Sequence, residues 1–72
     1  MAQIKAHITG TVWKIEVAVG DAIDEDGVIL ILESMKMEMP VESNVAGRVT
    51  ELHVREGEAV AEGQLLATVE PD

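Results

Sequence analysis

A single lysine with a methionine on each side is the clearest candidate for chemistry in this chain. Met35-Lys36-Met37 lies between Glu33 and Glu38, although turns ordinarily use Gly, Asn, Asp, Ser or Pro. An enzyme can acylate a lysine amine once it removes the proton that the amine carries at neutral pH. Acylation removes the positive charge and ties a long arm to the protein surface. The segment therefore indicates a lysine that is presented for covalent modification.

Other kinds of reactive site find little support. There is no cysteine, and His7 and His53 lie in different parts of the chain without the spacing of metal ligands. The acidic clusters at 24–26 and 55–58 lack the ligand sequence of a calcium loop and fall in expected turns. We expect no catalytic residue, no metal site and no enzymatic activity of the chain itself.

The residues on either side of the lysine predict two paired strands. Residues 28–32 form a continuous apolar run after Asp26-Gly27, which favours a central strand buried on both faces. The next strand, over 37–43, contains Pro40, which has no N–H to donate, so it is expected at a sheet edge or beside a bulge. Many such short runs, rich in Val and Ile, predict an all-β chain.

Met35 and Lys36 are then expected at the tip of the hairpin between these two strands. The tip contains no glycine or asparagine, so a type I turn is predicted, because that turn accepts most residues. A hairpin tip lies far from the core, so the Lys36 amine is expected to be exposed and unpaired. Met35 and Met37 either pack on the flanks of the hairpin or offer adaptable side chains to a partner.

An internal repeat of 37 residues organises the chain. Residues 10–33 align without a gap with residues 47–70. Two copies are too few for a solenoid, which needs about three, so we expect two similar half-sheets packed face to face around a pseudo-twofold axis. They form a single domain over residues 1–72, joined by the Lys36 hairpin. Four glycines that align between the copies are expected in turns with positive φ: Gly10, Gly20, Gly47 and Gly57.

The composition disfavours several classes of binding partner. The 14 acidic residues against 5 basic ones give a formal net charge of −9, which repels nucleic acid and anionic lipid. No apolar run approaches the roughly 20 residues of a membrane span. Trp13 is the only aromatic residue, so the core is expected to be aliphatic and without a deep pocket. The absence of cysteine fits the cytoplasm, and with Met1 as its start the chain is expected to be a complete protein.

The segment from Glu33 to Met37 resembles the attachment motif of biotin carboxyl carrier domains, in which a lysine between two methionines at a hairpin tip is biotinylated. The resemblance covers essentially the whole chain, including the break at Gly20-Asp21 and the segment Gly47-Arg48-Val49. The resemblance to the small stand-alone biotin/lipoyl attachment proteins is close. It implies a flattened β-barrel, or barrel-sandwich hybrid, of two four-stranded antiparallel sheets.

The same resemblance implies a non-catalytic carrier in a biotin-dependent carboxylase system such as an acyl-CoA carboxylase. A biotin protein ligase would join biotin to Lys36 as a swinging arm. A biotin carboxylase would load a carboxyl group, and a carboxyltransferase would remove it. Met35 and Met37 are expected to be recognised by the ligase, and recognition of the Glu33 carboxylate is a hypothesis.

Two other functions stay open beside the biotin carrier. In the related lipoyl domains the modified lysine usually follows aspartate and precedes alanine, whereas Met35 and Met37 flank Lys36 here. By resemblance, biotin is therefore favoured over lipoate as the covalent cofactor. The third possibility is an unmodified structural or interaction module, because the same fold can serve as a spacer in larger assemblies.

Overall fold

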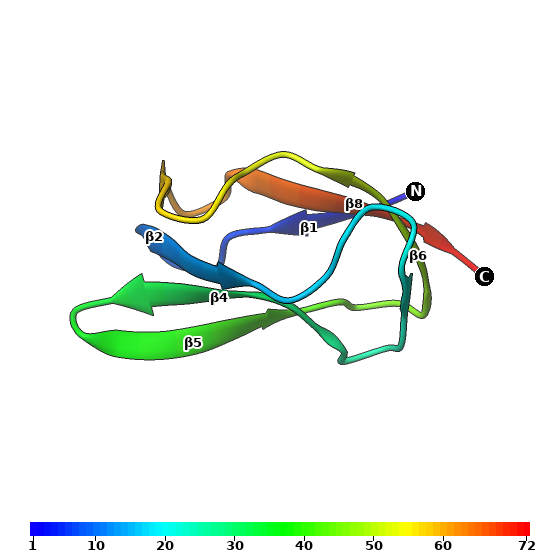
Figure 1. Ribbon diagram of the computed structural model, residues 1–72, viewed down its shortest axis with the longest axis horizontal. Helices are drawn as coiled ribbons and strands as arrows, with labels where there is room; N and C mark the ends of the chain where they lie inside the picture. Colours follow the sequence, from blue (N-terminus) through cyan, green and yellow to red (C-terminus); the bar gives the residue numbers. More distant parts are fainter.

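The computed structural model describes residues 1–72 as eight β-strands with no helix, and hence with no helix that could cross a membrane. The strands are β1 (Ala2–Lys5), β2 (Gly10–Ile15), β3 (Ala22–Ile23), β4 (Val28–Ser34), β5 (Met37–Glu42), β6 (Gly47–Leu52), β7 (Ala59–Val60) and β8 (Leu65–Pro71). They form two antiparallel sheets, in the orders β1-β8-β6-β3 and β5-β4-β2-β7 (Figure 1). The predicted all-β fold of two four-stranded sheets is confirmed, as a flattened sandwich that does not close into a continuous barrel.

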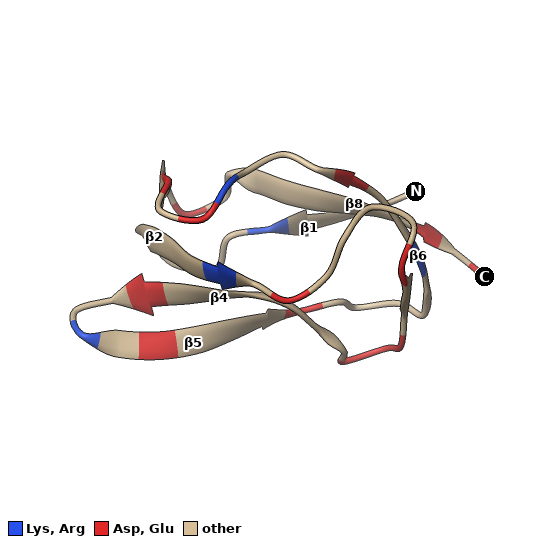
Figure 2. Ribbon diagram, viewed as in Figure 1, with Lys and Arg blue, Asp and Glu red and all other residues tan.

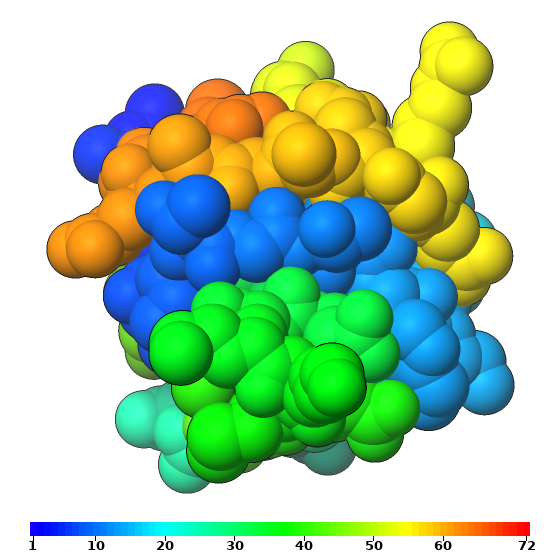
Figure 3. All heavy atoms as spheres, turned by 90° about the vertical axis from the view of Figure 1, so that its left-hand side faces the viewer, coloured from blue at the N-terminus to red at the C-terminus, as the bar shows by residue number.

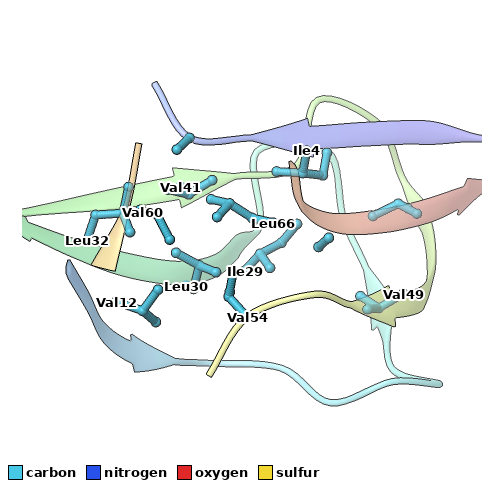
Figure 4. Close-up of a cluster of buried hydrophobic side chains, with 13 residues drawn as sticks. Ile4, Val12, Ile29, Leu30, Leu32, Val41, Val49, Val54, Val60 and Leu66 are labelled. Atoms are coloured by element: carbon cyan, nitrogen blue, oxygen red, sulfur yellow. The ribbon is translucent and has the colours of Figure 1, made fainter. Parts of the chain in front are cut away.

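The core lies between the two sheets and is entirely aliphatic (Figure 4). Val, Leu and Ile side chains each contribute roughly 1.5–3 kcal/mol when fully buried. The core consists of Ile4, Ala6, Val12, Ile29, Leu30, Leu32, Val41, Val49, Val54, Val60, Leu66, Ala67 and Val69. Trp13 is not among them and is 48% exposed.

Strand β4 is central, as predicted, because it lies between β5 and β2. The expectation that it is buried on both faces is wrong. Leu30 and Leu32 point into the core and are fully buried, whereas Ile31 between them is only half-buried and Glu33 is exposed. From Leu30 to Glu33 the side chains alternate, and those that face outward are not fully covered. Ile29 is also fully buried, beside the bulge between Val28 and Leu30. Strand β5, which contains Pro40, is an edge strand as predicted.

The two halves are related by the 37-residue repeat down to individual hydrogen bonds. The Gly20 N–H donates to the Val49 carbonyl at 2.7 Å, and the Gly57 N–H donates to the Val12 carbonyl at 2.7 Å. Fourteen of the 15 backbone hydrogen bonds outside the strands form seven pairs of this kind. The same shift carries the strand order of one sheet onto that of the other. The predicted pseudo-twofold relation is therefore present, and it also includes β1 and β5.

Two of the four aligned glycines have the expected role. Gly20 and Gly57 adopt φ angles of 99° and 89° in turns, a region that side chains other than glycine rarely enter. Each turn is closed by an acidic side chain, since Asp21 and Glu58 accept hydrogen bonds from the backbone N–H three residues earlier. These glycines therefore set the direction of the chain between β2 and β3 and between β6 and β7.

The positive φ expected for the other two glycines is wrong. Gly10 and Gly47 begin β2 and β6 and press against the backbone of the neighbouring strand. A Cβ atom on Gly10 would overlap the carbonyl of Glu33, and a Cβ atom on Gly47 would overlap the carbonyl of Glu70. Glycine is needed at these positions for space and not for backbone conformation.

We expect Gly47→Ala and Gly10→Ala each to lower the free energy of unfolding by about 1–3 kcal/mol, the usual cost of overpacking. The two losses should be similar because the pseudo-twofold axis relates the sites. Urea denaturation checks this, and Glu51→Ala, at an exposed position on β6, serves as the control with a change of about 0.5 kcal/mol or less. An unchanged urea midpoint for Gly47→Ala would contradict the close approach.

Candidate functional site

Lys36 lies at the tip of the β4–β5 hairpin, at one extreme of the molecule. The hairpin forms the left end of the view in Figure 1, and both chain termini lie at the other end. Figure 2 shows the lysine as the positive charge at this tip. The molecule measures 35 × 18 × 18 Å along its principal axes. The tip therefore lies at one end of the long axis of the molecule, away from both chain termini.

The turn itself differs from the prediction. Ser34 pairs with Met37, which leaves Met35 and Lys36 as a two-residue loop. Their φ angles are +53° and +65°, and two central residues with positive φ define a type I′ turn, so the predicted type I turn is wrong. A type I′ turn follows the right-handed twist of the two strands, whereas a type I turn would splay them. The twist of the hairpin therefore determines the turn type. The positive φ angle costs roughly 1–2 kcal/mol for each of the two non-glycine residues.

The side chains in and beside the turn are exposed, and Met35 is almost fully so. Met35 is 93% exposed and Met37 is 59% exposed, and Lys36 is exposed between them. The ion pairs of the chain join other residues, and no side-chain hydrogen bond involves Lys36. An incoming group can therefore reach the Lys36 amine without displacing a partner. Met35 stands clear of the hairpin and does not pack on its flank.

Two carboxylates face each other below the turn. Glu33 on β4 is the direct cross-strand partner of Glu38 on β5, and both are exposed (Figure 2). Like charges directly opposite each other destabilise a sheet, so this pair gains nothing for the fold. It places negative charge on both strands beside the Lys36 ammonium. A partner with basic residues would relieve the repulsion.

The structure places no metal-ligand cluster and no groove at the lysine. No group of three or more His, Cys, Asp and Glu residues is close enough to hold a metal ion. The chain has one shallow groove, of about 370 Å³, and Lys36 does not line it. That groove runs along the edge of β5 and is lined by Lys5, His7, Asp26, Pro40, Val41, Glu42, Ser43 and Asn44.

Two features of the site escaped the sequence analysis. The positive φ angles of Met35 and Lys36 are invisible without knowing that the loop has two residues, because neither residue is a usual type I′ residue. The pairing of Glu33 with Glu38 follows once the loop length is known, by counting back from the turn. Strand pairing, and not residue type, carries both pieces of information.

Comparison with known proteins gives a consistent result. The family model described as "Biotin-requiring enzyme" matches residues 1–69. The biotin/lipoyl attachment protein of Bacillus subtilis is 40% identical over 63 residues, which are 88% of this chain and 86% of the relative. A protein of Mycobacterium leprae, named as a homolog of a biotinylated protein, is 39% identical over 66 residues, covering 92% of this chain and 93% of the relative.

A solved structure shows the same fold inside a much larger protein. The crystal structure of the Kluyveromyces lactis urea carboxylase superposes on 96% of this chain with a TM-score of 0.91 and 32% sequence identity. The match covers 6% of the urea carboxylase chain. The chain is thus similar to small proteins of about its own size and to one small part of a carboxylase.

Relief of the strained turn gives a test of its geometry. We expect Met35→Asn to raise the free energy of unfolding by about 0.5–1 kcal/mol, because asparagine tolerates positive φ better than methionine. For a domain of this size the melting temperature should rise by about 2–8 °C. Met37→Asn is the matched control: Met37 begins a strand, where asparagine is unfavourable, so it should bring no gain. A melting temperature that Met35→Asn leaves unchanged or lowers would contradict the type I′ turn.

Proposed function

Because the chain belongs to the family of biotin/lipoyl attachment domains, we propose that it carries biotin covalently on Lys36 and moves a carboxyl group between two enzyme sites. One observation carries the proposal: an exposed lysine without a partner stands between two exposed methionines at a hairpin tip. When bound, biotin would take up a carboxyl group on its ureido ring and later give it up. The chain itself is a non-catalytic carrier.

The attachment step needs little from the domain beyond access. A base on the ligase would take a proton from the Lys36 ammonium, and the amine nitrogen would attack the activated carboxyl carbon of biotin. An amide bond forms as the activating group leaves. The step removes one of the 5 positive charges of the chain, and no ion pair or side-chain hydrogen bond is lost. The fold can accept the modification without rearrangement.

The carrier's contribution is positional. A cofactor on the tip of a domain held near its partners meets each enzyme site at a high effective concentration, of the order of millimolar for short flexible links. Both termini lie at the end opposite Lys36 (Figure 1). A connection made there to a larger assembly would therefore leave the tip free to enter successive sites.

The partners we propose are a biotin protein ligase, a biotin carboxylase and a carboxyltransferase, acting in the cytoplasm. The match to part of the urea carboxylase supports a place in a carboxylase system. The net charge of −9 favours partner surfaces with basic rims, since complementary charge speeds encounter. The same charge disfavours nucleic acid and anionic membranes as partners.

Lipoate is the second candidate cofactor, because relatives in this family are named for both attachments. The two methionines favour biotin through their resemblance to the biotin motif. The intact mass of the purified chain separates the two, since the adducts differ in mass. A chain that stays unmodified in the presence of both ligases and both cofactors would support an interaction module instead.

The first test replaces the acceptor while keeping its charge. We expect Lys36→Arg to abolish biotinylation by a biotin protein ligase supplied with biotin and ATP, because arginine offers no acylatable amine under these conditions. The unaltered chain should gain a single adduct with the mass of biotin less one water. Lys5→Arg and Lys14→Arg, at two other exposed lysines, are the controls and should be modified normally. A streptavidin signal from Lys36→Arg would contradict the proposal.

The second test concerns the carboxylate below the turn. We expect Glu33→Gln to lower kcat/KM for biotinylation by at least about tenfold, the loss for one charge-assisted hydrogen bond to the ligase. Glu70→Gln is the matched control, because Glu70 occupies the equivalent position 37 residues later, at the end without a lysine. Equal rates for the two variants would show that the ligase does not recognise Glu33.

A further inference from the structure

An apolar row crosses the outer face of the sheet that carries the hairpin. Ile31 on β4 pairs with Pro40 on β5 and with Lys14 on β2. Directly paired residues share a face of the sheet. Trp13 is the extra residue of a bulge between Val12 and Lys14, where regular alternation is interrupted. Val12 is buried, whereas Trp13 is 48% exposed and lies on the outer face with Lys14. Trp13, Ile31 and Pro40 are called the outer row below.

The outer row is open to solvent. Trp13 is 48% exposed, Pro40 is exposed and Ile31 is half-buried. The only aromatic side chain of the protein therefore lies on the surface, and the core is built without an aromatic residue. Tryptophan is among the residues that contribute most to binding at protein interfaces. Figure 3 shows residues of β2 (blue) directly beside the hairpin (green) at this end of the molecule.

The pseudo-twofold relation supplies an internal control for the outer row. The residues 37 positions away, on the outer face of the other sheet, are Thr50, Thr68 and Gln3. That face is polar and is closed by its own bonds: Thr50 Oγ1 donates to the Thr68 carbonyl at 3.2 Å, and Thr68 Oγ1 lies 3.1 Å from His53 Nε2. The fold therefore has no need for apolar side chains at these positions. They occur only on the sheet that carries Lys36.

Charges around the outer row indicate what it would meet. Glu33 and Glu38 lie on the side toward the turn, and Glu42 and Glu16 lie on the other side; all four are exposed. The cation beside the row, Lys14, is in an ion pair with Glu16 at 3.8 Å. An apolar strip between acidic borders is complementary to an apolar protein surface rimmed by Lys and Arg.

The position of the row favours one occupant. Pro40 is four residues from Lys36, which is about 13 Å along a strand at roughly 3.3 Å per residue. An enzyme that brings the bare Lys36 amine into its active site must touch the turn. Its footprint would be about 800 Å², or about 30 Å across, and would extend over the row. An enzyme that uses the carried cofactor reaches it at the end of a longer arm and need not approach so closely.

We propose that the outer row is a docking surface for the ligase that acylates Lys36. The ligase contributes an apolar patch rimmed by Lys and Arg. This inference rests on the proposed function. Trp13 contacts the ligase outside its active site. This contact does not alter the conformation of the Met35-Lys36 turn. Binding therefore depends on the row, and the chemical step depends on Lys36.

The test is the kinetics of biotinylation with Trp13→Thr, which installs the residue that the other half carries at this position. We expect KM for the carrier to rise roughly tenfold with kcat within about twofold of the unaltered chain, as for loss of one interface tryptophan. Pro40→Gln, which likewise installs the residue type of the equivalent Gln3, should raise KM several-fold. Val19→Thr is the matched control, since Val19 is 59% exposed and lies outside the row, and its KM should not change.

The possible results separate the two claims. An unaltered chain that no biotin protein ligase modifies would overturn both the proposed function and the docking surface. A modified chain whose KM is unchanged by Trp13→Thr, or equally raised by Val19→Thr, would overturn the docking surface alone. Melting temperatures report whether each variant is folded. If Trp13→Thr melts below the assay temperature, the KM of Pro40→Gln becomes the test. An unchanged KM for Pro40→Gln would then overturn the proposed docking surface.

Discussion

The register of β4 is the constraint on which the site depends. Leu30 and Leu32 are fully buried between the sheets, and the pairing of β4 with β5 and β2 follows from that burial. A slip of one residue would turn Glu33 toward the core and bring the leucines into solvent, because side chains alternate along a strand. The core therefore fixes which two residues form the turn, and it fixes Lys36 at the tip although Lys36 itself is exposed.

The turn is strained, and the burial of core side chains offsets the free-energy cost of that strain. Two non-glycine residues with positive φ cost roughly 1–2 kcal/mol each, while each buried leucine contributes roughly 1.5–3 kcal/mol. Leu30 and Leu32 thus offset the turn on their own strand. The type I′ geometry keeps the strands of the hairpin close up to Ser34 and Met37. The result of the strain is a two-residue tip, with Lys36 exposed and in no ion pair.

Much of the fold could be predicted from the sequence, because the repeat and the apolar runs record the packing directly. The position of Lys36 at a hairpin tip followed from two adjacent strand patterns. The errors come from the relation between neighbouring strands and from which faces of the sheets are covered. The turn type depends on strand twist, the need for glycine at Gly10 and Gly47 depends on contact with Glu33 and Glu70, and the exposure of Ile31 depends on an uncovered face. None of these is a property of the residue alone.

The most direct measurement is peptide-level mass spectrometry of the unaltered chain after incubation with biotin, ATP and a biotin protein ligase. A parallel incubation uses lipoate and a lipoate ligase. We expect a biotin adduct on the peptide that contains Lys36, no adduct on Lys5 or Lys14, and no lipoyl adduct. Biotin on another lysine, or lipoate in place of biotin on Lys36, would contradict the account.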